Sequence, residues 1–193
     1  MSAKVDLTGK VAVVTGGGGI LCSSMAKALA ECGAKVAILD LRLENAEKVA
    51  KDIVGKGGNA IGIATNVLDL ESLKAAEKEI HERFGTCDIL INGAGGNHPK
   101  GTTSAEKLTL ADIQNPVPGK ITFFDLDPAG IGFVFNLNFL GTLLPCQVFC
   151  REMALKGGGC VINISSMNAF KPLTKIPAYS AAKAAISNFT QWL

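Results

Sequence analysis

The residues best suited to proton transfer are a tyrosine and a lysine spaced one helical turn apart. The chain's single tyrosine, Tyr179, begins the sequence YSAAK, and Lys183 follows four positions later on the same face of a predicted helix. A tyrosine with a pKa of about 10 is a poor base at neutral pH, and a neighbouring ammonium favours the tyrosinate. Ser166 precedes Tyr179 by 13 positions, and its hydroxyl could hold a substrate oxygen. These side chains predict acid–base chemistry on an alcohol or carbonyl group.

A glycine-rich turn near the N-terminus has the composition of a phosphate-binding loop. The sequence TGGGGILC, residues 15–22, follows a predicted strand and precedes a predicted helix. Glycine suits this position because the backbone must approach a pyrophosphate, to which the helix N-terminus presents free N–H groups. Gly17, Gly19 and Cys22 nearly satisfy the GxGxxG spacing, with Cys22 in place of the third glycine. A small cysteine could fit there at the cost of some separation between helix and strand.

Asp40 ends the next predicted strand, 24 positions after Gly16. In a dinucleotide-binding unit, a carboxylate here accepts hydrogen bonds from the ribose hydroxyls and repels a 2′-phosphate. The sequence therefore predicts NAD as the cofactor in preference to NADP. Two alternatives remain open: Asp40 could be an ordinary solvated strand end, and Arg42 could host a phosphate.

The elements that position these residues alternate between short β-branched runs and amphipathic helical stretches, which is typical of βαβ units with a parallel sheet. Glycines and the N-caps Asp69 and Asp127 set several helix boundaries. The predicted strands are residues 11–15, 35–39, 60–65, 88–92 and 160–164. The predicted helices are residues 23–32, 43–54, 69–84, 128 to about 157, and 179 to the end.

Two stretches depart from this alternation. Residues 95–122 are rich in Gly, Pro, Thr and Asn and lack a strong period, so we expect residues 96–122 to form an insertion loop near the active site. Residues 128–150 carry no charge and could cross a bilayer by length alone. Asn136, Asn138, Pro145 and Gln147 argue against a membrane span. We expect this helix and the last one to be buried in a homodimer or homotetramer.

Composition excludes several classes of protein. The 193 residues are 48% hydrophobic and 19% charged, which is typical of a globular domain, and a formal charge of +2 without a basic block argues against a nucleic-acid partner. The six cysteines form no CxxC pair, and the two histidines stand near none of them, so we expect free thiols and no metal site. The first ten residues, MSAKVDLTGK, lack the apolar region of a signal peptide, which predicts a cytoplasmic protein.

Five motifs in order resemble those of the short-chain dehydrogenase/reductase family, in its compact single-domain branch. They are TGGGG at 15–19, NGAG at 92–95, NFLG at 138–141, NISS at 163–166 and YSAAK at 179–183. The resemblance implies that Tyr179 is the acid–base, that Lys183 lowers its pKa and binds the nicotinamide ribose, and that Ser166 orients the carbonyl. It also implies that Asn138 holds a water in a proton relay to Lys183. Ser165 is the competing serine, and the spacing to Tyr179 favours Ser166.

The same resemblance implies a nucleotide site around the glycine-rich turn. Besides Tyr179 and Lys183, the implied cofactor-binding residues are Gly16, Gly18, Gly19, Ile20, Asp40, Asn66, Val67, Asn92 and Ala94. Some positions depart from the family pattern. Ile20 and Cys22 stand where glycines are usual, Asn66 replaces an aspartate, and Gly93 replaces the second asparagine and with it that side chain's sheet-stabilising hydrogen bonds.

The segments 15–22, 96–103 and 165–183 together resemble the branch of D-mannonate oxidoreductases and related sugar-acid dehydrogenases. A polar, cationic set near the expected pocket suits a hydroxylated carboxylate: Asn97, His98, Lys100, Asn168 and Lys171. We therefore expect NAD-dependent oxidation of a secondary alcohol in a small-molecule sugar acid such as mannonate or gluconate, or the reverse reduction. Two alternatives remain: an extended-type sugar-nucleotide epimerase or dehydratase, because Gly16, Gly19 and Cys22 also resemble TGxxGxxG, and a non-catalytic NAD-binding subunit.

The fold that follows is a Rossmann-type, doubly wound α/β domain. We expect strand order 3-2-1-4-5, with the cofactor across the carboxyl ends of the strands at the switch between strands 1 and 4. Because the family's chains are longer, the resemblance also implies that residues 1–193 are a single catalytic domain truncated at its C-terminus, without the last strands.

Overall fold

The computed structural model describes residues 5–193. The chain divides into two compact units. The first unit consists of the residues up to 94 together with 141–164, and the second consists of 95–140 and 165–193.

The first unit is built on a parallel sheet of five strands: β1 (Val11–Thr15), β2 (Lys35–Asp40), β3 (Asn59–Ala64), β4 (Ile89–Asn92) and β5 (Cys160–Asn163). Their order is β3-β2-β1-β4-β5, which confirms the order expected from the sequence. The run VAVVT of β1 is buried throughout, as expected for a central strand covered on both faces. Thr15, Asn92 and Asn163 lie side by side at the carboxyl ends of β1, β4 and β5.

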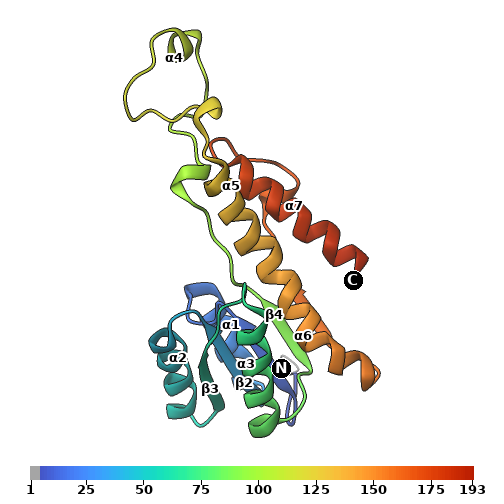
Figure 1. The fold of residues 1–193 in the computed structure, drawn as a ribbon. Helices are drawn as coiled ribbons and strands as arrows, with labels where there is room; N and C mark the ends of the chain where they lie inside the picture. The colour runs from blue at the N-terminus through green and yellow to red at the C-terminus, as the bar shows by residue number, and fades with distance from the viewer. Residues whose placement is uncertain (1–4) are drawn as a thin grey trace. The chain divides into compact units, whose positions relative to one another are not determined.

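Four helices belong to this unit: α1 (Ile20–Glu31), α2 (Leu43–Gly55), α3 (Leu70–Phe84) and α6 (Gly141–Leu155) (Figure 1). Small and branched side chains of α1 and α2, among them Ala26 and Val49, pack against Ala12 and Val14 on one face of β1. Successive residues of a strand point to opposite faces, so Val13 faces the other way. Helix α3 contacts β2, helix α6 contacts β4, and these two helices contact each other. The doubly wound α/β fold is thereby confirmed.

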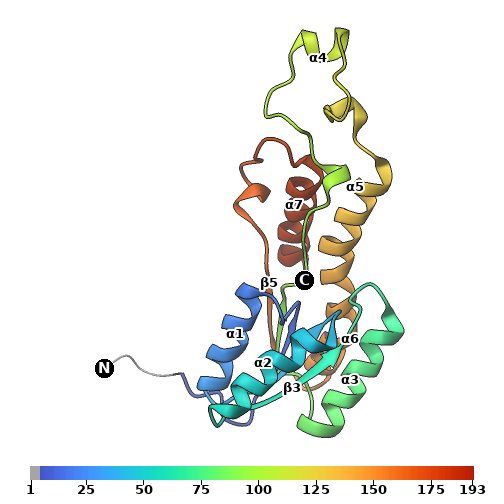
Figure 2. The same ribbon diagram turned by 90° about the vertical axis from the view of Figure 1, so that its left-hand side faces the viewer.

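The second unit contains two long helical segments and several short ones. Helix α5 (Pro128–Phe135), the π turn η3 (Asn136–Leu140) and helix α7 (Pro177–Trp192) form its packed part, where Val134 of α5 meets Ala178 and Ala182 of α7. The short elements are η1 (Pro99–Gly101), α4 (Leu110–Gln114), η2 (Phe123–Asp125) and η4 (Met167–Ala169). Within this unit, the loop that carries α4 extends away from the α5–α7 pair (Figure 2).

The predicted helix boundaries need four corrections. Helix α1 begins at Ile20 and not at Ser23. The apolar pattern did not predict this start because Ile20 and Leu21 are exposed. Helix α7 begins at Pro177, before the predicted Tyr179, since proline is already in the right conformation for the first helical position. The unpatterned insertion contains the short helix α4. The predicted uncharged helix is divided by the π turn at Asn136–Leu140.

The helical stretch Pro128–Leu155 is long and apolar enough to cross a membrane by length and composition, and 39% of its most apolar window is buried inside the protein. A buried core helix of a soluble protein passes the same test, so the stretch is weak evidence for a span. All six cysteines are free thiols. Within residues 5–193, no group of three or more His, Cys, Asp or Glu side chains could hold a metal ion.

Candidate functional site

The glycine-rich turn connects β1 to α1 and is held by close backbone contacts within the first unit. Gly16 has a left-handed φ of 62°, and a Cβ on it would lie 2.9 Å from both N and Cα of Ala94. The turn closes when the Gly19 N–H donates to the Gly16 carbonyl at 3.0 Å. The structure thus brings together Gly16, Gly19 and Ala94, three of the residues predicted to bind the cofactor.

The N-terminus of α1, directly after this turn, suits an anion. Its N-cap Gly19 offers no side-chain cap, and the first turn of the helix has no acidic residue. Helix α3 differs, since the Asp69 carboxylate accepts the N–H groups of Glu71 and Ser72 there. The first N–H groups of a helix need a partner from outside the helix. At Ile20, therefore, the residues present fit a pyrophosphate bound at the helix N-terminus.

Asp40 lies beside the turn, as the cofactor prediction requires. Its Oδ2 accepts the N–H of Gly18 at 3.1 Å, and its Oδ1 accepts the N–H of Arg42 at 3.1 Å. The Arg42 guanidinium has a partner of its own: with the amide oxygen of Asn45 turned toward it, Nε and Nη2 donate at 3.0 and 2.9 Å. A carboxylate oxygen accepts more than one hydrogen bond, so Asp40 retains capacity for ribose hydroxyls.

The segment after β3 adjoins Asp40 through the backbone, because the Thr65 N–H donates to the Asp40 carbonyl at 2.8 Å. Asn66 is exposed and Val67 is buried. The amide oxygen of Asn66 accepts the N–H of Leu68 at 3.0 Å, which holds the start of the turn into α3. Asn66 and Val67, two of the residues predicted to bind the cofactor, therefore directly follow Thr65, which bonds to the backbone of Asp40.

Asn92 ends β4, and its side chain ties the sheet together. Its Nδ2 donates to Oδ1 of Asn163 on β5 at 2.9 Å and to Sγ of Cys146 on α6 at 3.2 Å. Its Oδ1 is buried without a hydrogen-bond partner in the described chain. Side-chain bonds across the sheet are therefore present here although Gly93 stands in place of the second asparagine.

Two of the four departures from the family pattern, Cys22 and Gly93, face each other. A Cβ on Gly93 would lie 2.1 Å from Sγ of Cys22 and 3.1 Å from the carbonyl oxygen of Thr15. The N–H groups of Gly93 and Ala94 both donate to Oγ1 of Thr15, at 3.1 and 3.3 Å. The thiol thus occupies the space that any side chain at position 93 would enter. The absence of a side chain at Gly93 makes room for the Cys22 thiol. Sequence spacing did not reveal this relation.

The predicted acid–base residues all belong to the second unit, and three of them converge. Lys183, only 5% exposed, has its Nζ 5.6 Å from the centre of the Tyr179 ring. A Cβ on Gly95 would lie 3.4 Å from this Nζ and 2.8 Å from Oδ1 of Asn138. The lysine ammonium and the asparagine amide therefore meet over a glycine whose lack of a side chain leaves room for both. The sequence places Gly95 only within the NGAG motif. Its position between these two groups is seen only in the structure.

Three hydrogen bonds to backbone groups hold the side-chain amide of Asn138. Its Oδ1 accepts the Gly96 N–H at 3.3 Å, and its Nδ2 donates to the carbonyls of Gly96 at 2.7 Å and Val134 at 2.8 Å. Val134 is four residues earlier, so the side chain takes a carbonyl that an α-helix would use internally. The wider π turn at this point follows from that competition, and such turns are frequent at functional sites.

The two candidate serines have different partners. Ser165 Oγ donates to the Lys183 carbonyl at 3.1 Å and is 2.7 Å from Oγ of Ser187, so it fastens the chain to α7. Ser166 Oγ accepts the Asn168 N–H at 3.2 Å. This geometry favours Ser166 over Ser165 as the hydroxyl that faces a substrate.

The polar set expected near the pocket is less cationic than its sequence indicates. Lys100 forms an ion pair with Asp127 at 3.1 Å. His98 accepts the Lys100 N–H through Nδ1 and packs against Phe133 with ring centroids 5.0 Å apart. The set also includes exposed Lys171 and Asn97, which donates to Thr102 Oγ1. Asn168 differs from all of these because it is buried.

The insertion loop, 96–122, has a base and a tip with different contacts. At the base, η1 packs on α5, and the Thr103 N–H donates to the Lys175 carbonyl at 2.9 Å. At the tip, Ser104 and Ile121 bond to each other in both directions, and Asp112 pairs with Lys120.

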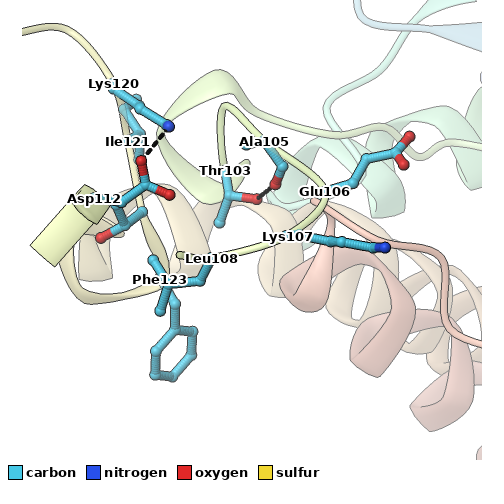
Figure 3. Close-up of a pocket in the computed structure, with 10 residues that line it drawn as sticks. Thr103, Ala105, Glu106, Lys107, Leu108, Asp112, Lys120, Ile121 and Phe123 are labelled. Atoms are coloured by element: carbon cyan, nitrogen blue, oxygen red, sulfur yellow. Dashed lines mark hydrogen bonds and ion pairs between the residues drawn. The ribbon is translucent and has the colours of Figure 1, made fainter. Parts of the chain in front are cut away.

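A small pocket of about 130 Å³ lies inside the tip, between these bonds (Figure 3). Its lining residues are Thr103, Ala105, Glu106, Lys107, Leu108, Asp112, Lys120, Ile121, Thr122 and Phe123. None of them is a predicted site residue. The base of the loop, through Gly96, is the part in contact with Asn138.

Comparison with known proteins decides the family. The model of the short chain dehydrogenase family matches residues 10–193. The chain belongs to this family. It is 58% identical, over its whole length, to an "uncharacterized oxidoreductase" of Haemophilus influenzae, of which it covers 66%. It is 34% identical to the D-threitol dehydrogenase of Mycolicibacterium smegmatis, over 92% of this chain and 60% of that one.

Among solved structures, the chain resembles a Haemophilus influenzae protein with bound NAD, whose proposed activity is that of a D-mannonate oxidoreductase. The TM-score is 0.92 at 58% identity, and the alignment covers 97% of this chain and 66% of that one. The family member described here therefore spans about two thirds of the length of the proteins it matches. The resemblance drawn from five sequence motifs is confirmed, and the names of these relatives do not favour the epimerase alternative.

Proposed function

We propose that the protein is an NAD-dependent oxidoreductase that oxidises a secondary alcohol of a polyhydroxy compound, or reduces the corresponding ketone. The observation that carries the proposal is the convergence of the Lys183 ammonium on the Tyr179 ring and on the Asn138 amide in the second unit. Packing alone does not explain a buried ammonium beside a tyrosine, because removing a charge from water costs free energy. The family assignment gives this arrangement its chemical meaning.

The residues of the first unit fit a dinucleotide. The uncapped N-terminus of α1 would hold the pyrophosphate, and Asp40 would accept the adenosine ribose hydroxyls. Because a 2′-phosphate would meet the Asp40 carboxylate, we infer NAD over NADP. The NAD bound in the Haemophilus relative supports the same choice. When bound, the nicotinamide supplies the hydride acceptor or donor.

The chain's own residues would transfer the proton of the substrate hydroxyl. Ser166 Oγ holds the oxygen of the substrate alcohol, and the Tyr179 phenolic oxygen takes its proton as the carbonyl forms. Lys183 stabilises the tyrosinate through its positive charge. The amide of Asn138, clamped to Gly96, holds a water that returns the proton toward solvent through Lys183.

The substrate we favour is a sugar acid such as mannonate or gluconate. The resemblance of segments 15–22, 96–103 and 165–183 to sugar-acid dehydrogenases and the proposed activity of the Haemophilus relative support it. The D-threitol dehydrogenase relative extends the range to other polyhydroxy alcohols. The pairing of Lys100 with Asp127 leaves fewer free cations for a carboxylate than the sequence indicates.

The proposal is tested by following NADH formation with the protein at the full length its gene encodes, on D-mannonate, D-gluconate, D-threitol and xylitol. Tyr179→Phe should lower kcat by about 10²-fold to 10⁴-fold, the range for a positioned acid–base group. NAD affinity, measured by titration, should be nearly unchanged in Tyr179→Phe and weakened in Lys183→Ala. Near wild-type turnover by Tyr179→Phe would reject the mechanism. NAD binding without turnover of any substrate would leave a nucleotide-binding subunit.

We also propose self-association and a cytoplasmic location. Phe133, Leu140 and Trp192 are large apolar side chains that α5, η3 and α7 leave 45%, 37% and 80% exposed, and a second copy would cover them. Six free thiols suit a reducing compartment. Sedimentation at micromolar concentration should give a dimer or tetramer, and a stable monomer would contradict this assembly.

A further inference from the structure

One buried acceptor near Ser166 has no partner. Asn168 is 5% exposed, and its Oδ1 is a buried atom without a hydrogen bond in the described chain. An unpaired buried acceptor lowers stability, so buried polar atoms in native proteins nearly always have a partner. Asn97 differs because it is exposed and donates to Thr102 Oγ1, and Asn138 differs because both of its amide atoms are bonded.

The position of Asn168 links this acceptor to the proposed reacting groups. It lies on the single turn η4, two residues after Ser166, and its own N–H donates to Ser166 Oγ at 3.2 Å. The same turn packs on α7, the helix that carries Tyr179 and Lys183. The orphaned oxygen therefore belongs to the short segment that positions the proposed substrate hydroxyl ligand.

We infer that Asn168 is a specificity-determining residue whose Oδ1 accepts a hydrogen bond from a second substrate hydroxyl, adjacent to the carbon that is oxidised. This inference rests on the proposed function. The missing partner must be a donor, and at neutral pH a substrate carboxylate has none, whereas every hydroxyl has one. The group recognised here is thus a neighbouring hydroxyl and not the acid group. An alcohol without it would leave Oδ1 unpaired, which is how polar sites reject such analogues.

The test compares two alcohols that differ by this one hydroxyl, 2,3-butanediol and 2-butanol, with NAD and the full-length protein. Wild type should prefer the diol by about 10-fold to 100-fold in kcat/KM, the range for leaving one buried acceptor unpaired. Asn168→Ala and the bulkier Asn168→Leu both remove the acceptor, and each should bring the ratio close to one, chiefly through a higher KM for the diol. Asn168→Asp, which keeps an acceptor oxygen, should retain most of the preference.

Asn188→Ala is the matched control, because it removes an exposed amide from α7 and should leave the ratio unchanged. NAD titration and circular dichroism report whether each variant is folded. If both acceptor-free variants fold and keep the wild-type ratio, Oδ1 is satisfied by a bound water and the inference fails while the proposed function stands. If wild type reduces NAD with neither alcohol nor with D-mannonate or xylitol, the proposed function itself has failed.

Discussion

Cys22 and Gly93 form a packed pair that a double-mutant cycle can test. Gly93 does not have a left-handed φ, so alanine at this position is compatible with the backbone, and Gly93→Ala tests the side-chain space alone. The new Cβ would lie 2.1 Å from Sγ of Cys22, whereas non-bonded heavy atoms prefer separations of about 3.5–4.0 Å. Cys22 is buried in the main core cluster, which limits how far its thiol can turn away.

The magnitude follows from these contacts. Overpacking of this kind typically costs about 1–3 kcal/mol. Cys22→Ala alone removes one buried sulfur and should cost about 1 kcal/mol. In the double variant the sulfur is gone and the remaining Cβ–Cβ separation of 3.6 Å is an ordinary contact. The double variant should therefore be about 1–3 kcal/mol more stable than the sum of the two single effects.

Urea unfolding of the four proteins measures this coupling energy. Gly55→Ala is the matched control, because the structure has nothing within 4 Å of a Cβ at that helix end, and it should be neutral or slightly stabilising. Single effects that add within about 0.5 kcal/mol, the level seen for independent sites, would refute the packing argument. So would a Gly93→Ala variant as stable as wild type.

Three further outcomes are expected. Asp40→Ala should reduce discrimination against NADP by about 1–3 kcal/mol, since it removes a carboxylate that accepts the ribose hydroxyls and repels the phosphate; equal titration of NAD and NADP by wild type would contradict its role. Ser166→Ala should lower kcat while NAD affinity is kept, whereas Ser165→Ala should mainly lower the melting temperature, because its hydroxyl only fastens the chain to α7. Hydrogen bonding to Lys120 lowers the pKa of Asp112 from 3.8 to about 2. The pair therefore stabilises the folded loop above pH 4 and is lost as pH falls toward 2, so hydrogen exchange of the tip should accelerate there and not in Asp112→Asn.

The sheet could be predicted almost residue by residue. Buried parallel strands have continuous apolar runs: VAVVT lies between Lys10 and Gly16, and VAIL lies between Lys35 and Asp40. Helix α3 was equally clear because Asp69 caps it and Leu73, Ala76 and Ile80 form a buried stripe. The sequence alone predicted an element correctly wherever the same local residues both favour its secondary structure and supply its buried face.

It was insufficient where a side chain competes with the backbone. The π turn at Asn136–Leu140 depends on Asn138, whose Nδ2 donates to the carbonyls of Val134 and of Gly96, 42 residues away in the chain, and whose Oδ1 accepts the Gly96 N–H. No period or propensity of the helix itself contains that information. The motif NFLG identified the residue, and only the fold revealed why the helix widens around it.

The departures at Cys22 and Gly93 illustrate the same limit at the nucleotide loop. Taken singly, each position lacks a residue that the family pattern predicts, and each suggests a weaker site. Taken as a pair, they conserve volume, because the thiol on α1 enters the space that glycine at the end of β4 leaves open. Replacing only one member with the usual residue should therefore harm the loop more than leaving both as they are, since a Cβ at position 93 collides with the sulfur and a glycine at position 22 leaves a void.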